Sequence, residues 1–285
     1  MNWYTPVTME ELAAALAQGG ESSRVIAGGT DYTIHLRQGK ANPGALIYPG
    51  RIPALREIML TEDSLRIGAM ATMAELSLAL AAVPEFAAIA DAAGGVGSPQ
   101  IRSKATLVGN LCNASPAGDM LPIAKLYDMV LEVLDGNGRL TDVSVSDFFL
   151  GPGKTALQPG QAVTAVRANR TAVTGWVSAF HKIGFRSYVS IARIGMGVLL
   201  HIDAAGVISD ARLTLGAVAN VPIRVYAAER LMQGKPLDRA MLEKVTAVVS
   251  RTVHDNCRPA NRLYKTEAAR GLCADVFAQL EKRMS

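Results

Sequence analysis

The sequence is organised around Thr106-Leu-Val-Gly-Asn-Leu-Cys-Asn-Ala-Ser-Pro-Ala-Gly-Asp119, a stretch dense in glycine and small polar residues. Such residues add little to a hydrophobic core. Glycine allows a backbone to approach a ligand closely, while Asn, Ser and Thr offer hydrogen bonds with little bulk. The stretch therefore predicts a loop that binds an anionic, hydroxyl-rich ligand.

A second stretch, Val25-Ile-Ala-Gly-Gly-Thr-Asp31, has the same character. Its β-branched start breaks at Gly28-Gly29 and leads into a helix-like segment over 32–38. A strand, a glycine turn and a helix N-terminus together form an anion site. A glycine pair between strand and helix is also an ordinary turn, so this stretch alone leaves both interpretations open. Two such loops can grip one diphosphate from two sides.

Three segments in order carry a family resemblance: Ala27–Asp31, Gln100–Arg102 and Ala105–Asp119. Together they resemble the flavin subunit of the molybdenum hydroxylases, a family that includes xanthine dehydrogenase and bacterial carbon monoxide dehydrogenase. The resemblance continues in Phe180–Lys182 with Arg186, and then in four segments of the last third: 211–219, 222–224, 228–229 and 234–237. It thus covers nearly the whole chain.

The expected fold class is α+β. The resemblance implies a two-part FAD-binding domain, with a small β-α-β part and a larger mixed α/β part, over residues 1–170. A C-terminal α+β domain with a small antiparallel sheet and helices would follow over 171–285. Residue patterns agree with this division. They predict the β-α-β unit over 23–48, a strand at 64–68, helices at 72–82 and 86–93, a hairpin over 129–143 and a linker over 167–175.

In the second half, strands are expected at 176–182, 191–202 and 212–217, before helices at 224–232, 239–253 and toward 282. The glycine-rich run Gly94-Gly-Val-Gly-Ser-Pro99 is expected to be a loop. It does not predict a dinucleotide site, because serine and proline stand where the last glycine of that motif should fall.

The chain has 285 residues, 49% of them hydrophobic and 19% charged, with a net charge of +4. This length suffices for two modest domains. Lysine and arginine are scattered, so we expect a solvated surface and no nucleic-acid partner. No apolar run is long enough for membrane insertion. Met1–Pro6 lacks the pattern of a signal peptide, which predicts a cytoplasmic protein.

Cys112, Cys257 and Cys273 are far apart in the sequence, without the short spacings of iron–sulfur or zinc sites. We therefore expect no metal and no required disulfide on this chain. No histidine has a partner at a recognisable catalytic spacing, so no catalytic residue is assigned. The four histidines are His35, His181, His201 and His254.

The resemblance implies that FAD binds non-covalently, with its diphosphate between the two loops. The first loop would contribute Ala27, Gly28, Gly29, Thr30 and Asp31, and the second Thr106, Gly109 and Asn110. Asn113 and Asp119 would bond the ribityl and diphosphate region, and Cys112 would supply a backbone position. Lys182 would lie at the pyrimidine edge of the flavin, where a cation stabilises negative charge.

Each assignment has an ordinary structural alternative. Asp31 and Asp119 both stand at predicted helix starts, where a carboxylate caps the helix. Lys182 is also explained as a surface lysine, and Cys112 as a small apolar filler.

Two residues depart from the family pattern. Val108 stands where relatives have glycine, and a positive φ at this position would strain the valine by more than about 1 kcal/mol. Ser190 replaces an aspartate of many relatives.

The family resemblance implies that the chain is an FAD-binding electron-transfer subunit. Electrons would arrive from [2Fe–2S] clusters on a small partner subunit, after substrate oxidation at a molybdenum cofactor on a large one, and would leave to an acceptor such as NAD. One alternative is a flavin-free scaffold or ligand-binding protein of the same fold, and another is a self-sufficient flavin oxidase. The organic substrate and the acceptor are not readable from this chain.

Overall fold

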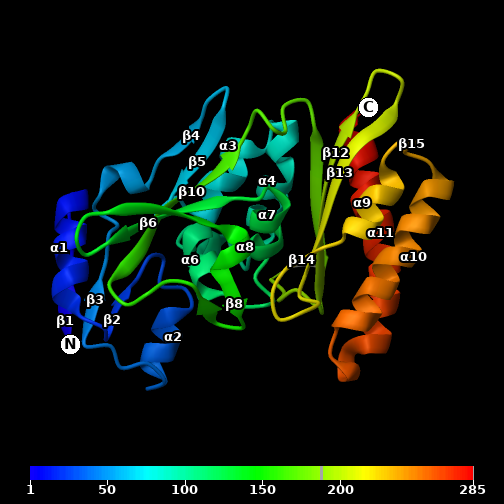
Figure 1. Cartoon of the computed structure of the whole chain (residues 1–285). Coiled ribbons are helices and arrows are strands. Elements are labelled where there is room, and N and C mark those ends of the chain that lie inside the picture. The colour runs from blue at the N-terminus through cyan, green and yellow to red at the C-terminus, as the bar shows by residue number, and fades with distance from the viewer. Residues whose placement is uncertain (187–188, 285) are drawn as a thin grey trace.

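The computed structural model describes residues 1–186 and 189–284, and in these residues the chain forms three sheets of three or more strands, flanked by helices, and a separate two-stranded ribbon (Figure 1). The N-terminal part holds a small parallel sheet and a larger antiparallel one. A second antiparallel sheet follows, covered on its far side by the last helices of the chain.

The small parallel sheet has the order β1-β3-β2, with β1 at Asn2–Tyr4, β2 at Ser23–Val25 and β3 at Ala45–Ile47. Helix α1 (Met9–Gly19) precedes β2, and α2 (Tyr32–Arg37) joins β2 to β3. The predicted β-α-β unit is confirmed, and β1 extends its sheet. Thr8 caps α1 by accepting from the Glu11 N–H at 3.2 Å.

The larger N-terminal sheet is antiparallel, in the order β4-β5-β10-β6-β7. Its strands are Ile58–Leu60 (β4), Ser64–Gly68 (β5), Gln161–Asn169 (β10), Val130–Asp135 (β6) and Leu140–Ser144 (β7). Strand β5 and the β6–β7 hairpin match their predicted places. The linker predicted to begin at Arg167 is wrong over its first residues, because the central strand β10 continues to Asn169.

Helices cover this sheet and lead toward the next one (Figure 1). They are α3 (Met73–Leu80), α4 (Ala87–Gly95), α5 (Pro99–Arg102), α6 (Leu107–Asn113), α7 (Met120–Leu126) and α8 (Val145–Phe148). Short 3-10 turns lie at Pro53–Leu55 and Pro84–Phe86, and a two-stranded ribbon joins β8 (Phe149–Gly151) to β9 (Lys154–Thr155). The stretch from Thr106 to Asp119 is therefore not one continuous loop, since α6 occupies its first half.

The C-terminal sheet is antiparallel in the order β11-β12-β13-β14, with β15 paired to β13. The strands are Val177–Ile183 (β11), Ile194–Ile202 (β12), Val207–Gly216 (β13), Ile223–Arg224 (β14) and Lys235–Pro236 (β15). Helices α9 (Tyr226–Met232), α10 (Arg239–Asn256) and α11 (Arg262–Met284) follow, with a 3-10 turn at Pro259–Asn261. The expected order of strands and then helices is confirmed except for the short strand β15, which follows α9, and the helix predicted to begin at Arg224 begins at Tyr226 because Arg224 pairs in β14.

This sheet is buried on both faces. Helices α9 and α11 pack on one side of it, with α10 packed against these two helices, and α4 and α7 of the N-terminal part lie on the other side (Figure 1). Along β11, Val177 and Ala179 belong to the C-terminal core, whereas Phe180 belongs to the core of the N-terminal part. Double-sided burial explains why the sequence of β12 is almost continuously apolar.

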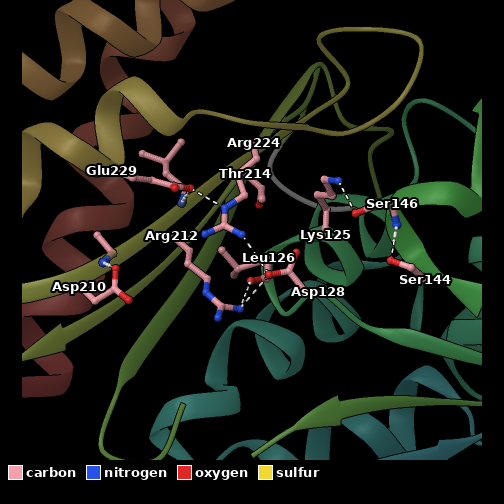
Figure 2. A network of polar contacts seen from close by, with 12 residues as sticks. Lys125, Leu126, Asp128, Ser144, Ser146, Asp210, Arg212, Thr214, Arg224 and Glu229 are labelled. Carbon is pink, nitrogen blue, oxygen red and sulfur yellow. Dashed lines mark hydrogen bonds and ion pairs between the residues drawn. The ribbon is translucent and has the colours of Figure 1, made fainter. Parts of the chain in front are cut away.

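A polar network ties α7 to the C-terminal sheet, as Figure 2 shows. Asp128 Oδ2 forms an ion pair with Arg212 Nη1 at 3.2 Å and accepts a hydrogen bond from Arg224 Nη1 at 3.0 Å. Glu229 Oε1 accepts from Arg224 Nε at 2.8 Å and from the Leu213 N–H at 2.9 Å. These contacts give a structural reason for the Arg224 and Glu229 segments of the resemblance.

Replacing Glu229 with alanine is expected to destabilise the chain by about 3 kcal/mol, since the buried Leu213 N–H loses its acceptor and the Arg224 guanidinium keeps only Asp128 as a partner. Urea unfolding measures the loss. The matched control is Glu243→Ala, which removes an exposed ion pair with Arg239 on α10 and should cost less than about 0.5 kcal/mol. Equal losses in the two variants would contradict the role given to Glu229.

Across residues 1–186 and 189–284, none of the helices combines the length and the apolar character needed to cross a bilayer.

Candidate functional site

The first glycine loop, Ala27–Asp31, connects β2 to α2 and packs against the chain just before α6. A Cβ added at Gly28 would lie 1.9 Å from the carbonyl oxygen of Lys104, a distance that no side chain tolerates. Gly29 has φ +67°, and its carbonyl accepts from the Thr33 hydroxyl at 2.7 Å. Glycine is thus required at Gly28 by close approach and favoured at Gly29 by backbone conformation.

The second element begins at Thr106, which is buried and caps α6. Its Oγ1 accepts from the Gly109 N–H at 2.9 Å. A Cβ added at Gly109 would lie 3.9 Å from the Cβ of Ala27, so the start of α6 faces the first loop. Asn110 Oδ1 accepts from the Met120 N–H at 3.3 Å and thereby holds the start of α7 against α6. The two predicted loops therefore meet.

Val108 lies in the first turn of α6, is buried, and is not among the residues with positive φ. The strain considered for a valine at this glycine position is therefore absent. Valine fits because a helical residue needs no positive φ, and its side chain joins the core of the N-terminal part. Ser190, the other departure, accepts from the Phe185 N–H at 2.9 Å.

Lys182 on β11 pairs with Asp119 at the start of α7, and both side chains are largely buried, with exposed fractions of 15% and 6%. Burial raises the pKa of Asp119 to about 6, although the charge of Lys182 acts in the opposite direction. Within the described residues, the second carboxylate oxygen, Oδ1, is buried without a hydrogen-bond partner. Lys182 is therefore no ordinary surface lysine.

Capping does not explain either aspartate, since neither Asp31 nor Asp119 makes a side-chain hydrogen bond to its helix. Asp31 is exposed and lies 3.3 Å from His35 Nε2, while Asn113 is exposed and Thr30 half-buried. Within the described residues, no side-chain hydrogen bond or ion pair joins Asp31 or Asn113 to the opposite loop. Burial raises the pKa of Cys112 to about 12, which agrees with a packing role and not with a reactive thiol.

A pocket of about 390 Å³ adjoins Lys182, lined by β11, the end of α4 and the turn before α5. Of the twelve cofactor-binding residues predicted from the sequence, Lys182 alone lines this pocket. The cofactor-binding residues assigned from the sequence did not include Asp91, Gly95 or Arg102, although Arg102 belongs to the resemblance. The prediction of a loop over Gly94–Pro99 is wrong at both ends, because Gly94 and Gly95 complete α4 and Pro99 begins α5. Arg102 Nη1 holds that turn by donating to the carbonyls of Val96 and Gly97, at 3.2 and 3.1 Å.

Asp119 should make stability depend on pH. The folded chain keeps the Asp119 proton up to about pH 6, whereas an unfolded aspartate loses it near about pH 4. Proton binding therefore favours the folded state below about pH 4, and this contribution disappears as pH rises through about 6. Relative to Asp119→Asn, the wild type should lose about 2–3 kcal/mol over that range. Urea unfolding at several pH values measures it, and a constant difference would contradict a raised pKa.

Comparisons with known proteins agree with this geometry. Residues 1–168 match the FAD binding domain in molybdopterin dehydrogenase, and residues 179–280 match the CO dehydrogenase flavoprotein C-terminal domain. The nicotinate dehydrogenase FAD-subunit of Eubacterium barkeri is 31% identical, over 98% of this chain and 97% of that one. The xanthine dehydrogenase FAD-binding subunit of Escherichia coli O157:H7 is 30% identical, over 88% and 86%.

Among solved structures, reconstituted CO dehydrogenase from Oligotropha carboxidovorans superposes with a TM-score of 0.88 at 26% identity, covering 99% of this chain and 98% of that one. The sequence, the fold and the junction of the two glycine loops point to one family. The chain therefore belongs to the FAD-binding subunits of the molybdenum hydroxylase family, whose members are oxidoreductases.

Proposed function

We propose that this chain holds FAD across the junction of its two glycine loops and passes electrons from [2Fe–2S] clusters of a small partner subunit to an external acceptor such as NAD. A large partner subunit would carry the molybdenum cofactor. The observation that carries the proposal is the close approach of the loops, where Gly28 lies against Lys104 and Gly109 faces Ala27.

The residues at this junction fit FAD. Backbone at Ala27, Gly28 and Gly29 lies beside the start of α6 without intervening side-chain bulk, which suits a diphosphate. The buried, unpartnered Oδ1 of Asp119 is an acceptor that a ribityl hydroxyl satisfies. We assign the cofactor contacts to Ala27, Gly28, Gly29, Thr30, Asp31, Thr106, Gly109, Asn110, Cys112, Asn113, Asp119 and Lys182.

When bound, FAD supplies the redox chemistry, and the protein supplies position and charge. Lys182 lies beside the pocket at Gly95, where its Cε is 3.7 Å from the place of an added Cβ. An ammonium there stabilises negative charge at the pyrimidine edge of a flavin ring. Asp119 holds that ammonium in place through the ion pair.

Partner subunits are proposed because the cysteines of this chain do not suffice to bind an iron–sulfur cluster. A [2Fe–2S] cluster takes four protein ligands, usually cysteines, and the whole sequence has three, all free. The relatives are themselves named as subunits of dehydrogenases, which supports a heteromeric complex. The division of the chain at residue 170 and the cytoplasmic location stay predictions.

The sequence argument for a flavin-free scaffold was backbone strain at Val108, and this strain is absent because Val108 lies in α6 without a positive φ. A self-sufficient oxidase has no observation in its favour.

Electron transfer is tested by purifying the chain together with co-expressed large and small subunits. Under anaerobic conditions, addition of the organic substrate should bleach the visible flavin absorbance, and addition of NAD should restore it. A complex without its clusters should leave the flavin oxidised. If the isolated FAD-loaded chain were reduced by substrate at the same rate, the partner-dependent route would be wrong.

A further inference from the structure

Strand β11 carries Lys182 at the edge of the C-terminal sheet, next to the N-terminal part of the chain. Alternate residues of a strand point to the same face, so Ser178, Phe180 and Lys182 share one face. The Ser178 hydroxyl accepts from the Ala88 N–H at 2.9 Å and donates to the Pro84 carbonyl at 3.0 Å. At Ser178, four residues before Lys182, this face of β11 is therefore hydrogen-bonded to α4.

Asp91 of α4 makes a second hydrogen bond to β11, at Phe180, two residues before Lys182. Its Oδ2 accepts from the Phe180 N–H at 3.0 Å and from Gln279 Nε2 at 2.9 Å. Arg283, in the last turn of α11, binds both oxygens of Asp91, at 2.8 and 2.7 Å, and also donates to the Ser178 carbonyl. The carboxylate thus joins α4, β11 and α11.

The Asp91–Arg283 pair has the features of a fixed contact. It is bidentate and largely buried, with exposed fractions of 17% for Asp91 and 25% for Arg283. The partners are 192 residues apart in the sequence, so local helix formation does not explain the pair. Asp91 also lines the same pocket as Lys182, and α4 places Gly95 beside the lysine stem.

We infer that the Asp91–Arg283 ion pair positions Lys182 against the flavin site. The pair fixes the outer edge of β11 at Ser178 and Phe180, and the next residue of that face is Lys182. Arg283 and Asp91 are positioning residues, because they act through β11 and touch neither the lysine nor the loops in any hydrogen bond found in the described chain. The inference rests on the proposed function, in which Lys182 faces FAD.

The test measures the reduction potential and the dissociation constant of bound FAD in the full chain, with thermal unfolding recorded beside them. The variants are Arg283→Gln, Arg283→Lys, Asp91→Asn and Lys182→Gln, together with the double variant Lys182→Gln/Arg283→Gln. Arg270→Gln is the control, since it removes an exposed ion pair with Glu267 on the same helix.

Direct electrostatics and positioning predict different signs. If the pair acted only through its own charges, loss of Arg283 would lower the potential and loss of the Asp91 charge would raise it. If it positions Lys182, both Arg283→Gln and Asp91→Asn lower the potential, as Lys182→Gln does, and both weaken FAD binding by about tenfold. Arg283→Lys should recover much of the loss, and Arg270→Gln should match the wild type.

The double variant completes the test. Once Lys182 is gone, Arg283→Gln should change the potential no further, although the loss of thermal stability remains. A higher potential in Asp91→Asn, or the full additional shift in the double variant, would overturn the inference. A wild-type chain that binds no FAD would instead contradict the proposed function. If Arg283→Gln does not fold, the test rests on Asp91→Asn, because asparagine keeps an acceptor for the Phe180 N–H. The sign of the change in the reduction potential of its bound FAD then decides.

Discussion

Gly28→Ala is expected to weaken FAD binding at least about 100-fold while the chain still folds. The added Cβ would lie 1.9 Å from the Lys104 carbonyl oxygen and 2.5 Å from its carbon, so the first loop must move away from the segment that leads into α6. A diphosphate held from two sides then loses one side. Titration with FAD, followed by flavin fluorescence, measures the affinity.

The matched control is Gly271→Ala on α11. An added Cβ there meets nothing within 4 Å, and alanine should even stabilise the helix by about 0.5–1 kcal/mol. Its FAD affinity should equal that of the wild type. Wild-type affinity in Gly28→Ala would mean that the close approach of the loops is not what binds the cofactor.

Lys182→Gln is expected to act on both stability and redox behaviour. Removing the cation leaves the Asp119 carboxylate buried without its counter-charge, which should cost about 3 kcal/mol at pH 7. The cost should shrink as pH falls toward about 6, because the Lys182 charge that lowers the pKa of Asp119 is absent from the variant, whose carboxyl therefore takes up its proton at a higher pH than in the wild type. The reduction potential of bound FAD should fall, since the flavin loses a neighbouring positive charge.

Urea unfolding at pH 5 and pH 7, with a spectroelectrochemical titration, measures these effects. Lys244→Gln, at an exposed position on α10, is the control and should change neither quantity. An Lys182→Gln chain with wild-type stability and potential would show that the ion pair seen here has no role at the flavin.

Local chemistry explains what the sequence predicted well. Strand β5 is bounded by turn residues and alternates in burial, and the β6–β7 hairpin follows from the Asp135–Gly138 turn, where Gly138 has φ +80°. The two glycine loops were visible because glycine is needed where backbones approach closely. The resemblance then supplied Lys182, whose strand pattern alone does not distinguish it from a surface lysine.

The missed features depend on long-range contacts. Strand β10 is central because it pairs with β5 and β6, a partnership that no local pattern of Gln161–Asn169 reveals. Asp91 looked like any helix aspartate, since its partner Arg283 lies 192 residues away. The first half of the Thr106–Asp119 stretch became helix α6 because Thr106 caps it, which outweighs the low helix propensity of its asparagines and glycine.

The central claim, that this chain binds FAD at the junction of the two loops, is tested most directly by the visible spectrum of the purified chain after incubation with FAD and gel filtration. The released chromophore is then identified after denaturation. We predict retention of about one FAD per chain, since the two glycine loops meet at a single junction. A chain that stays colourless, alone and together with the large and small subunits, would contradict the account.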